Sequence, residues 1–285
     1  MSQLIVVTGG ATGIGAATVV RFRARESKVI VLDVVSPNVA GVEFIECDLS
    51  DPASIDRAID RLPGSINALV NVAGIAESDR AETVVAVNFL GLRHLTEGLA
   101  TGGTDGATKA KLATGASIVN VASSAGRDWP SRQLAVSRLL DTADFASGLA
   151  WLCEHANEWQ DNPYKFSKQC AAAYTYRASA MGIERGLRVN CVNPGAVETR
   201  LAPDFKKLIG AGMYDWIAQQ VGRHGTPDDV AGVIEFLAVG DCGWLNGVEI
   251  TVDGGYYAGV VGGWIRPEES PNGTAHQGPS AARSQ

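Results

Sequence analysis

The chain has 285 residues, of which 46% are hydrophobic and 19% charged, and its formal net charge is −7. This length and composition are typical of one large or two small folded domains, and they exclude a disordered chain. The negative charge, together with the lack of a dense lysine and arginine run, argues against nucleic-acid binding.

Cysteine and histidine usage excludes two further classes. The five cysteines are scattered and form no Cys-x-x-Cys pair, and the four histidines are scattered as well. This pattern indicates reduced thiols in a cytoplasm, with no disulfide framework and no metal site. The N-terminal residues do not read as a secretory signal, and no stretch approaches 18 uncharged apolar residues, so we expect no membrane association.

Seven short apolar runs, rich in valine and isoleucine, alternate with longer helical patterns along the chain. The runs cover residues 4–9, 28–34, 42–48, 66–74, 117–123, 187–195 and 248–255. Runs of this kind suit strands that are covered on both faces. The alternation predicts an α/β fold: a doubly wound, parallel, seven-stranded sheet of the Rossmann type, with helices on both faces, in a single catalytic domain of residues 1–265.

Three segments lie outside a minimal version of this plan. Residues 126–163 are too long for a structureless loop and carry an apolar helical pattern, which predicts a helical insertion of one or two helices. Residues 199–222 are expected to form a substrate lid, with apolar side chains that line a pocket or pack in the core. Residues 266–285 are rich in proline, glycine and serine, and we expect a disordered tail there.

The first strand runs into the sequence TGGATGIGAA, which contains Gly9, Gly13 and Gly15. Gly9 allows a sharp turn, Gly13 lets the backbone approach a pyrophosphate, and Gly15 lets the following helix pack on the strand. The helix N-terminus then offers free N–H groups to the phosphates. The alternative is a tight turn without a ligand.

Acidic residues follow the second and third strands. Asp33 can accept hydrogen bonds from both adenosine ribose hydroxyls and would repel a 2′-phosphate, and Val34 and Val35 follow it in place of basic residues. We therefore expect NAD(H) over NADP(H). Asp48 is placed to bind the adenine amino group or to act as a helix N-cap.

The fourth strand ends in NVAG, residues 71–74. Asn71 is expected to lock neighbouring strands, and Ala73 and Gly74 lie where the cofactor ribose should pass. Tyr164 and Lys168 stand four residues apart at the start of a predicted helix, so they share a helix face. This pair is either a solvated surface or a tyrosine made reactive by a cation.

The motifs TGGATGIG, NVAG, SSAG, YKFSK and NPG occur in this order over residues 3–260. Together they resemble the classical short-chain dehydrogenase/reductase family. The resemblance implies a catalytic set of Asn88, Ser123, Tyr164 and Lys168, with Ser124 as the alternative serine. It also implies a cofactor site made of Gly9, Thr12, Gly13, Ile14, Asp33, Asp48, Leu49, Asn71, Ala73, Gly74, Tyr164, Lys168, Pro194, Gly195, Val197 and Thr199.

The resemblance further implies that Lys168 binds the nicotinamide ribose and lowers the pKa of Tyr164, which then acts as general acid or base. Ser123 binds the substrate oxygen, and Asn88 either holds a water beside Lys168 or caps a helix kink. Val197, through its backbone, and Thr199, through its hydroxyl, would contact the nicotinamide carboxamide.

Ser123 and Tyr164 are much further apart in the sequence than in most classical members of the family. The wide interval resembles the subgroup of bacterial 3α-hydroxysteroid dehydrogenase/carbonyl reductase. The inserted residues could block the helix contact through which most members form tetramers, so a homodimer is expected, with a homotetramer as the alternative. Trp129 or Trp159 of the insertion could contribute a pocket wall.

The leading prediction is an NAD-dependent alcohol dehydrogenase/carbonyl reductase that acts on a hydrophobic secondary alcohol or ketone, alicyclic, aromatic or steroid-like. A nucleotide-binding regulator without turnover is the first alternative, which the intact catalytic set disfavours. An isomerase or dehydratase of the extended branch of the family is the second, and the glycine spacing disfavours it.

Overall fold

The structure, a computed structural model, describes residues 2–102 and 109–272. A single parallel sheet runs through the molecule in the strand order β3-β2-β1-β4-β5-β6-β7. The strands are β1 Leu4–Thr8, β2 Lys28–Asp33, β3 Glu43–Glu46, β4 Ile66–Asn71, β5 Leu112–Val121, β6 Arg188–Pro194 and β7 Glu249–Val252. The strand order reverses between β1 and β4, as in a doubly wound fold, and the predicted fold class is confirmed.

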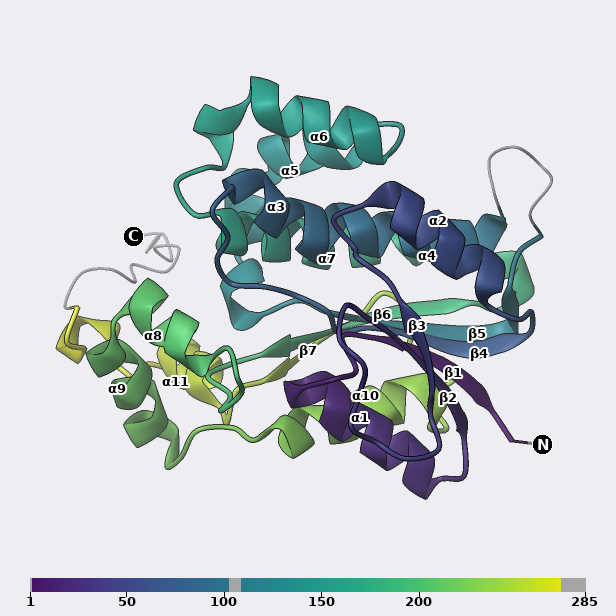
Figure 1. The fold of residues 1–285 in the computed structure, drawn as a ribbon. Coiled ribbons are helices and arrows are strands. Elements are labelled where there is room, and N and C mark those ends of the chain that lie inside the picture. Colours follow the sequence, from purple (N-terminus) through teal and green to yellow (C-terminus); the bar gives the residue numbers. More distant parts are fainter. Residues whose placement is uncertain (1, 103–108, 273–285) are drawn as a thin grey trace.

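Helices cover both faces of the sheet (Figure 1). The α-helices are α1 Gly13–Ala24, α2 Pro52–Arg61, α3 Ala81–Val85, α4 Gly91–Thr101, α5 Gln133–Leu140, α6 Phe145–Glu154, α7 Pro163–Ala178, α8 Ala202–Ile209, α9 Ala211–Val221, α10 Pro227–Val239 and α11 Tyr256–Gly262. The shorter turns are η1 Ala86–Leu90, a π-helix, and the 3-10 helices η2 Ser124–Gly126, η3 Trp129–Arg132, η4 Ala156–Glu158, η5 Ile183–Arg185 and η6 Pro267–Glu269.

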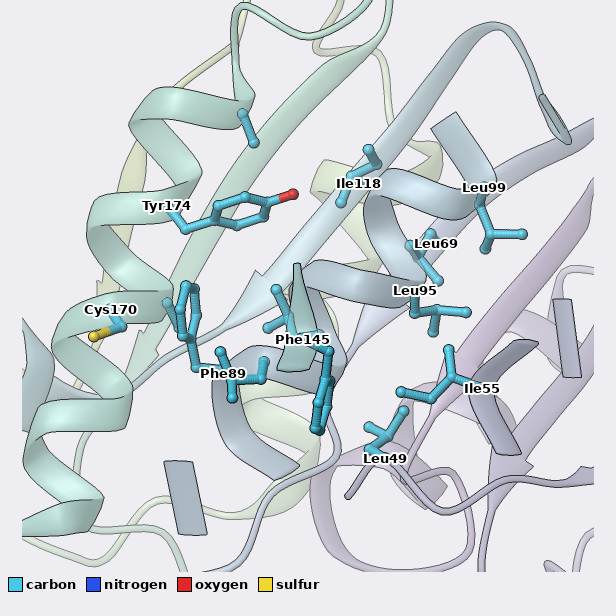
Figure 2. Packing of buried hydrophobic residues seen from close by; sticks show 14 of the residues in the cluster. Leu49, Ile55, Leu69, Phe89, Leu95, Leu99, Ile118, Phe145, Cys170 and Tyr174 are labelled. Carbon is cyan, nitrogen blue, oxygen red and sulfur yellow. The ribbon is translucent and has the colours of Figure 1, made fainter. Parts of the chain in front are cut away.

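Two apolar layers hold the helices to the sheet. One lies between the sheet and α2, α4 and α7, and the other lies between the sheet and α1 and α10. In the first layer, Leu69 of β4 and Ile118 of β5 belong to the same buried cluster as Phe89 and Leu95 (Figure 2). Burial on both faces explains why the strands read as unbroken apolar runs.

The inserted segment forms two α-helices, α5 and α6, above α4 and α7 (Figure 1), which confirms the predicted helical insertion. Arg93 of α4 is 3% exposed and donates hydrogen bonds to backbone oxygens of Leu139, Thr142 and Asp144. This buried guanidinium therefore ties the α5–α6 connection to the main domain.

The two tryptophans proposed as pocket walls both pack against other parts of the chain. Trp159 is fully buried, and its indole N–H donates to the Leu152 carbonyl at 2.9 Å. Trp129 packs against Tyr176, which lies about three helical turns beyond Tyr164 on α7. Trp159 stacks on Phe166 in the first turn of α7, so both side chains hold the insertion on this helix.

The chain after α11 is described as far as residue 272. Residues 267–269 form η6, and the side-chain amide of Asn272 donates to the Ile209 carbonyl at the end of α8. The remainder of the expected tail, residues 273–285, lies outside the described residues. Within 2–102 and 109–272, every helix is too short or too polar to span a bilayer.

Candidate active site

The glycine turn after β1 is shaped by two close backbone approaches. Gly9 has φ +66°, and a Cβ there would lie 2.6 Å from the Cα of Ala73. A Cβ on Gly15 would lie 2.0 Å from the Gly9 carbonyl oxygen. Any larger side chain at either position would therefore push the α1 turn away from the ends of β1 and β4.

The N-terminus of α1 is open to a ligand. Thr12 is its extended N-cap residue; its side chain caps no N–H group of the described helix, whose first turn also holds no acidic residue. Gly13 at φ +54° turns the chain into the helix, and Ile14 packs against the apolar layer beneath it. Free N–H groups at a helix N-terminus bind phosphate groups, so this turn fits a dinucleotide pyrophosphate.

Asp33 stands beside this turn at the end of β2. One carboxylate oxygen accepts the Ala11 N–H at 3.0 Å, and the other accepts the Val35 N–H at 3.2 Å. Each oxygen keeps a second lone pair, so the carboxylate can still accept bonds from two ribose hydroxyls. The following Val34 and Val35 are exposed and apolar.

The structure answers the question left open for Asp48. The N-cap of α2 is Asp51, whose carboxylate accepts the Ala53 N–H at 3.0 Å, while the exposed Asp48 accepts hydrogen bonds from Ser50. The helix-cap interpretation of Asp48 is therefore wrong. Leu49 is 7% exposed and packs in the core (Figure 2), which leaves only its backbone for a ligand.

A hydroxyl that the sequence analysis did not assign organises the end of β4. Thr8 pairs in register with Asn71, and its side-chain oxygen accepts the N–H groups of Val72 and Ala73, both at 3.1 Å. The Asn71 amide donates to Asn120 of β5, at 2.9 Å, and to α4, so it locks the strands as expected. The only signal for Thr8 in the sequence is a hydroxyl residue at a strand end.

Ser123 and Tyr164 come together at the carboxyl edge of the sheet. Ser123 follows β5 and is 9% exposed, whereas Ser124 is exposed. A Cβ on Gly126 would lie 2.4 Å from the Lys168 carbonyl, so this glycine lets the serine turn pack directly on α7. The Ser123 side chain consequently lies close enough to the Tyr164 hydroxyl to affect its pKa.

Tyr164 and Lys168 share the buried face of α7, which begins at Pro163. Their exposed fractions are 8% and 4%, so the alternative of a solvated helix face is wrong. The Lys168 ammonium donates to the Val121 carbonyl at 3.0 Å and lies 5.8 Å from the centre of the Tyr164 ring. The lysine is therefore held between α7 and β5.

The electrostatics of this pair differ from the prediction. Burial raises the pKa of Tyr164 to about 12, and the neighbouring Ser123 side chain only partly opposes it. Burial also lowers the pKa of Lys168 to about 8. The expected lowering of the tyrosine pKa by Lys168 is not seen in this structure, because burial dominates the pKa of Tyr164.

Asn88 lies at a helix irregularity, as one of the two roles considered for it requires, and its role in holding a water stays a prediction. It lies in the π-helix η1, and its side chain bonds both the N–H and the carbonyl of Ile75, at 2.8 and 2.9 Å. A Cβ on Gly74 would lie 3.1 Å from the Asn88 side-chain oxygen and 3.3 Å from the Lys168 nitrogen. Gly74 therefore faces the amide and the ammonium together.

The segment after β6 lies against the glycine turn. A Cβ on Gly13 would come 3.5 Å from Thr199, and the Gly195 N–H donates to the carbonyl of Val252, the last residue of β7. Pro194 ends β6 inside the protein. The structure thus brings the cofactor residues predicted from β1 and from β6 to the same edge of the sheet.

The segment predicted as a lid forms α8 and α9, and α8 lies against Tyr164. Phe205 of α8 packs edge-on against the tyrosine ring, with ring centres 5.1 Å apart, in an apolar cluster that includes Ala76 and Val84. Met213 and Tyr214 of α9 are about 1% exposed, so they act as core residues. The packing role is thus found in α9, and a pocket lined by α8 stays a prediction.

No group of three or more histidine, cysteine, aspartate or glutamate side chains in the described part of the chain is arranged to hold a metal ion.

Comparison with known proteins decides the family. The short chain dehydrogenase model matches residues 3–135, and the enoyl-(acyl carrier protein) reductase model matches residues 147–257. Coniferyl-alcohol dehydrogenase of Pseudomonas sp. (strain HR199 / DSM 7063) is 34% identical over 89% of this chain and 96% of its own length. The chain belongs to the short-chain dehydrogenase/reductase family.

Two further similarities agree with the predicted subgroup. The 3-alpha-hydroxysteroid dehydrogenase/carbonyl reductase of Comamonas testosteroni is 30% identical over 89% of this short-chain dehydrogenase/reductase and 96% of its own length. The crystal structure of 3-alpha-hydroxysteroid dehydrogenase from Pseudomonas sp. B-0831 complexed with NADH has a TM-score of 0.74 at 27% identity and covers 93% of this chain and 100% of that one. The protein is therefore an oxidoreductase of a family that uses nicotinamide cofactors on small molecules.

Proposed function

We propose that the protein is an NAD(H)-dependent alcohol dehydrogenase/carbonyl reductase that interconverts a hydrophobic, ring-bearing secondary alcohol and its ketone. One observation carries this proposal: the side chains of Ser123, Tyr164 and Lys168 lie close together under the apolar helix α8, beside the glycine turn. A catalytic serine, tyrosine and lysine in such a place suit the transfer of a proton to or from an alcohol oxygen.

In this proposal each side chain has a separate task. The Ser123 hydroxyl holds the substrate oxygen, and the Tyr164 hydroxyl oxygen takes the alcohol proton or returns it to the ketone. Lys168 fixes the cofactor ribose, and Asn88 supports a proton path beside it. A bound oxidised nicotinamide supplies the hydride acceptor and a positive charge that opposes the effect of burial on Tyr164.

Asp33 supports NAD(H) as the cofactor. Its carboxylate lies within hydrogen-bond distance of the glycine turn, where a 2′-phosphate would meet a negative charge. Replacing Asp33 with alanine should lower the ratio of kcat/KM with NAD to kcat/KM with NADP by about tenfold or more. An unchanged ratio would contradict the assignment.

The substrate class is supported by the apolar cluster around Tyr164, which contains Ala76, Val84 and Phe205. Three relatives are named for alcohols that carry a ring: coniferyl alcohol, cyclohexanol (Rhodococcus sp. (strain TK6), 28% identical over 89% of this chain and 95% of that protein) and a 3α-hydroxysteroid. We extend to this protein only the feature that these substrates share, an alcohol on a hydrophobic ring-bearing molecule. Coniferyl alcohol is a primary alcohol, so this relative supports the aromatic, ring-bearing class and not the secondary position of the hydroxyl.

The direct test is to mix the protein with NAD and each of these alcohols and to follow absorbance of the reduced cofactor. Turnover of cyclohexanol or a 3α-hydroxysteroid, and none with short polar alcohols, supports the proposal, whereas turnover of coniferyl alcohol alone would contradict the secondary-alcohol assignment. Tight NADH binding without turnover of any alcohol would favour the alternative of a nucleotide-binding regulator.

We also propose that the protein works as a homodimer in the cytoplasm. The helices α5 and α6 pack over α7 and would hinder a four-helix contact between copies. All five cysteines, each in the described part of the chain, are free thiols, which suits a reducing compartment. Light scattering of the purified protein would distinguish a dimer from a tetramer.

A further inference from the structure

Tyr214 joins the lid to the segment that follows β6. It lies in α9, is 1% exposed, and its hydroxyl donates a hydrogen bond to the Val197 carbonyl at 3.0 Å. Val197 is itself only 6% exposed. A buried hydrogen bond of this kind fixes the distance between the two segments, because losing it would leave the carbonyl without that partner.

Two side chains contact the Tyr214 ring. The ring of His224 stacks on it, with centres 4.4 Å apart, and the Lys206 ammonium of α8 lies 5.2 Å from its centre. Lys206 and His224 each have a nitrogen 3.5 Å from the Asp215 carboxylate. Tyr214 therefore contacts both lid helices and the chain beyond the lid.

The segment that receives this hydrogen bond is rigid and close to the cofactor turn. Val197 pairs with Gly225 in a parallel bridge, with hydrogen bonds of 2.8 and 2.9 Å on either side. Two residues later, Thr199 lies against Gly13 at the start of α1. A displacement of α9 would pull on Val197 and so reach the site proposed for the nicotinamide.

We propose that Tyr214 is a positioning residue that couples closure of the lid to binding of the nicotinamide cofactor. This inference rests on the proposed function. The coupling is reciprocal: a cofactor that contacts residues 196–199 holds the lid over Tyr164, and a closed lid strengthens cofactor binding by the same factor. The tyrosine hydroxyl itself touches neither the substrate nor the cofactor.

The test is the Tyr214→Phe variant of the full chain, which keeps the ring and its stacking and removes only the hydroxyl. The matched control is Tyr257→Phe, because Tyr257 is 43% exposed on α11 and its ring contact with Arg127 survives the change. NADH affinity is measured by fluorescence titration, and the lid by tryptic cleavage after Lys206 and Lys207, with and without NADH. NADPH replaces NADH if the cofactor preference proves to be reversed.

In the unsubstituted protein we expect NADH to slow cleavage at these two lysines. In Tyr214→Phe we expect the dissociation constant of NADH to rise about two- to tenfold, because one buried hydrogen bond is lost. We also expect NADH no longer to protect the lid from cleavage. The KM of the alcohol should rise by a similar factor, while Tyr257→Phe leaves all three quantities unchanged.

Three results would overturn the coupling: a lid that NADH does not protect in the unsubstituted protein, an unchanged NADH affinity in Tyr214→Phe, or a loss of thermal stability with both binding readouts intact. Failure of the proposed function gives a different result. An unsubstituted protein that binds the cofactor but turns over no alcohol would contradict the proposed function, and proteolysis with and without NADH would still measure the coupling.

Discussion

The insertion and the segment predicted as a lid are both pairs of helices with a contact to α7, but they are built differently. The insertion buries Leu139, Leu152 and Trp159 completely, and the buried Arg93 holds the α5–α6 connection. In the lid, the described helix α8, Ala202–Ile209, buries no residue fully, and α9 is anchored mainly by Met213 and Tyr214.

This difference indicates separate roles. A helix pair with fully buried side chains contributes to the stability of the whole domain, whereas a pair with few buried contacts can move at a small free-energy change. The catalytic helix α7 therefore has a fixed partner on its outer side and an adjustable partner over Tyr164. The predictions below test this division.

The largest expected effect is on stability, at the insertion. Replacing Trp159 with alanine should lower the free energy of unfolding by about 3–5 kcal/mol, because it empties a fully buried site and removes the bond to Leu152. Urea denaturation measures this loss. The KM of the alcohol should not change in the folded protein; a changed KM with unaltered stability would show that the insertion lines the pocket instead.

The next effect concerns the cost of burying Lys168 on α7. Its pKa falls from 10.5 to about 8 on folding, so between these values the unfolded chain binds a proton that the folded protein does not. The contribution of Lys168 to the free energy of unfolding therefore rises with pH over this window. The destabilisation of the folded protein by the buried ammonium is fully present below pH 8.

Lys168→Met removes that penalty. The stability of this variant relative to the unsubstituted protein should fall by about 2–3 kcal/mol as the pH rises from 7 to 10.5, at about 1.4 kcal/mol per unit of pKa shift. Urea denaturation at several pH values measures the difference. A pH-independent difference would mean that the ammonium is not desolvated.

The smallest stability effect is expected in the lid. Phe205→Ala should change the free energy of unfolding by about 1 kcal/mol or less, because the side chain is only partly buried. The KM of the alcohol should rise several-fold as the wall over Tyr164 is lost, and NADH affinity should stay the same. Phe236→Ala, at a phenylalanine 46% exposed on α10, is the control. A stability loss as large as that of Trp159→Ala would remove the distinction between lid and insertion.

The fold and most of the site follow from local sequence. Strands buried on both faces read as apolar runs, and Gly9, Gly13 and Gly15 indicate a turn with close backbone approaches, which the structure contains. The i, i+4 spacing places Tyr164 and Lys168 on one face wherever the helix lies.

The errors arise where distant segments decide the outcome. The raised pKa of Tyr164 depends on burial by segments as remote as Phe205 and Val84, which local spacing does not reveal. Asp48 and Asp51 both precede the same helix, and only the geometry of the turn selects Asp51 as the cap. The bond from Tyr214 to Val197 joins residues 17 positions apart through the folded lid.

The most direct test of the central claim is a comparison of turnover and NADH binding in Tyr164→Phe. The account predicts that turnover of a hydrophobic alcohol falls by at least about a hundredfold, because the group that exchanges the proton is removed, while NADH affinity stays within about twofold. Turnover that survives the loss of this hydroxyl would contradict the assignment of Tyr164 as the general acid and base.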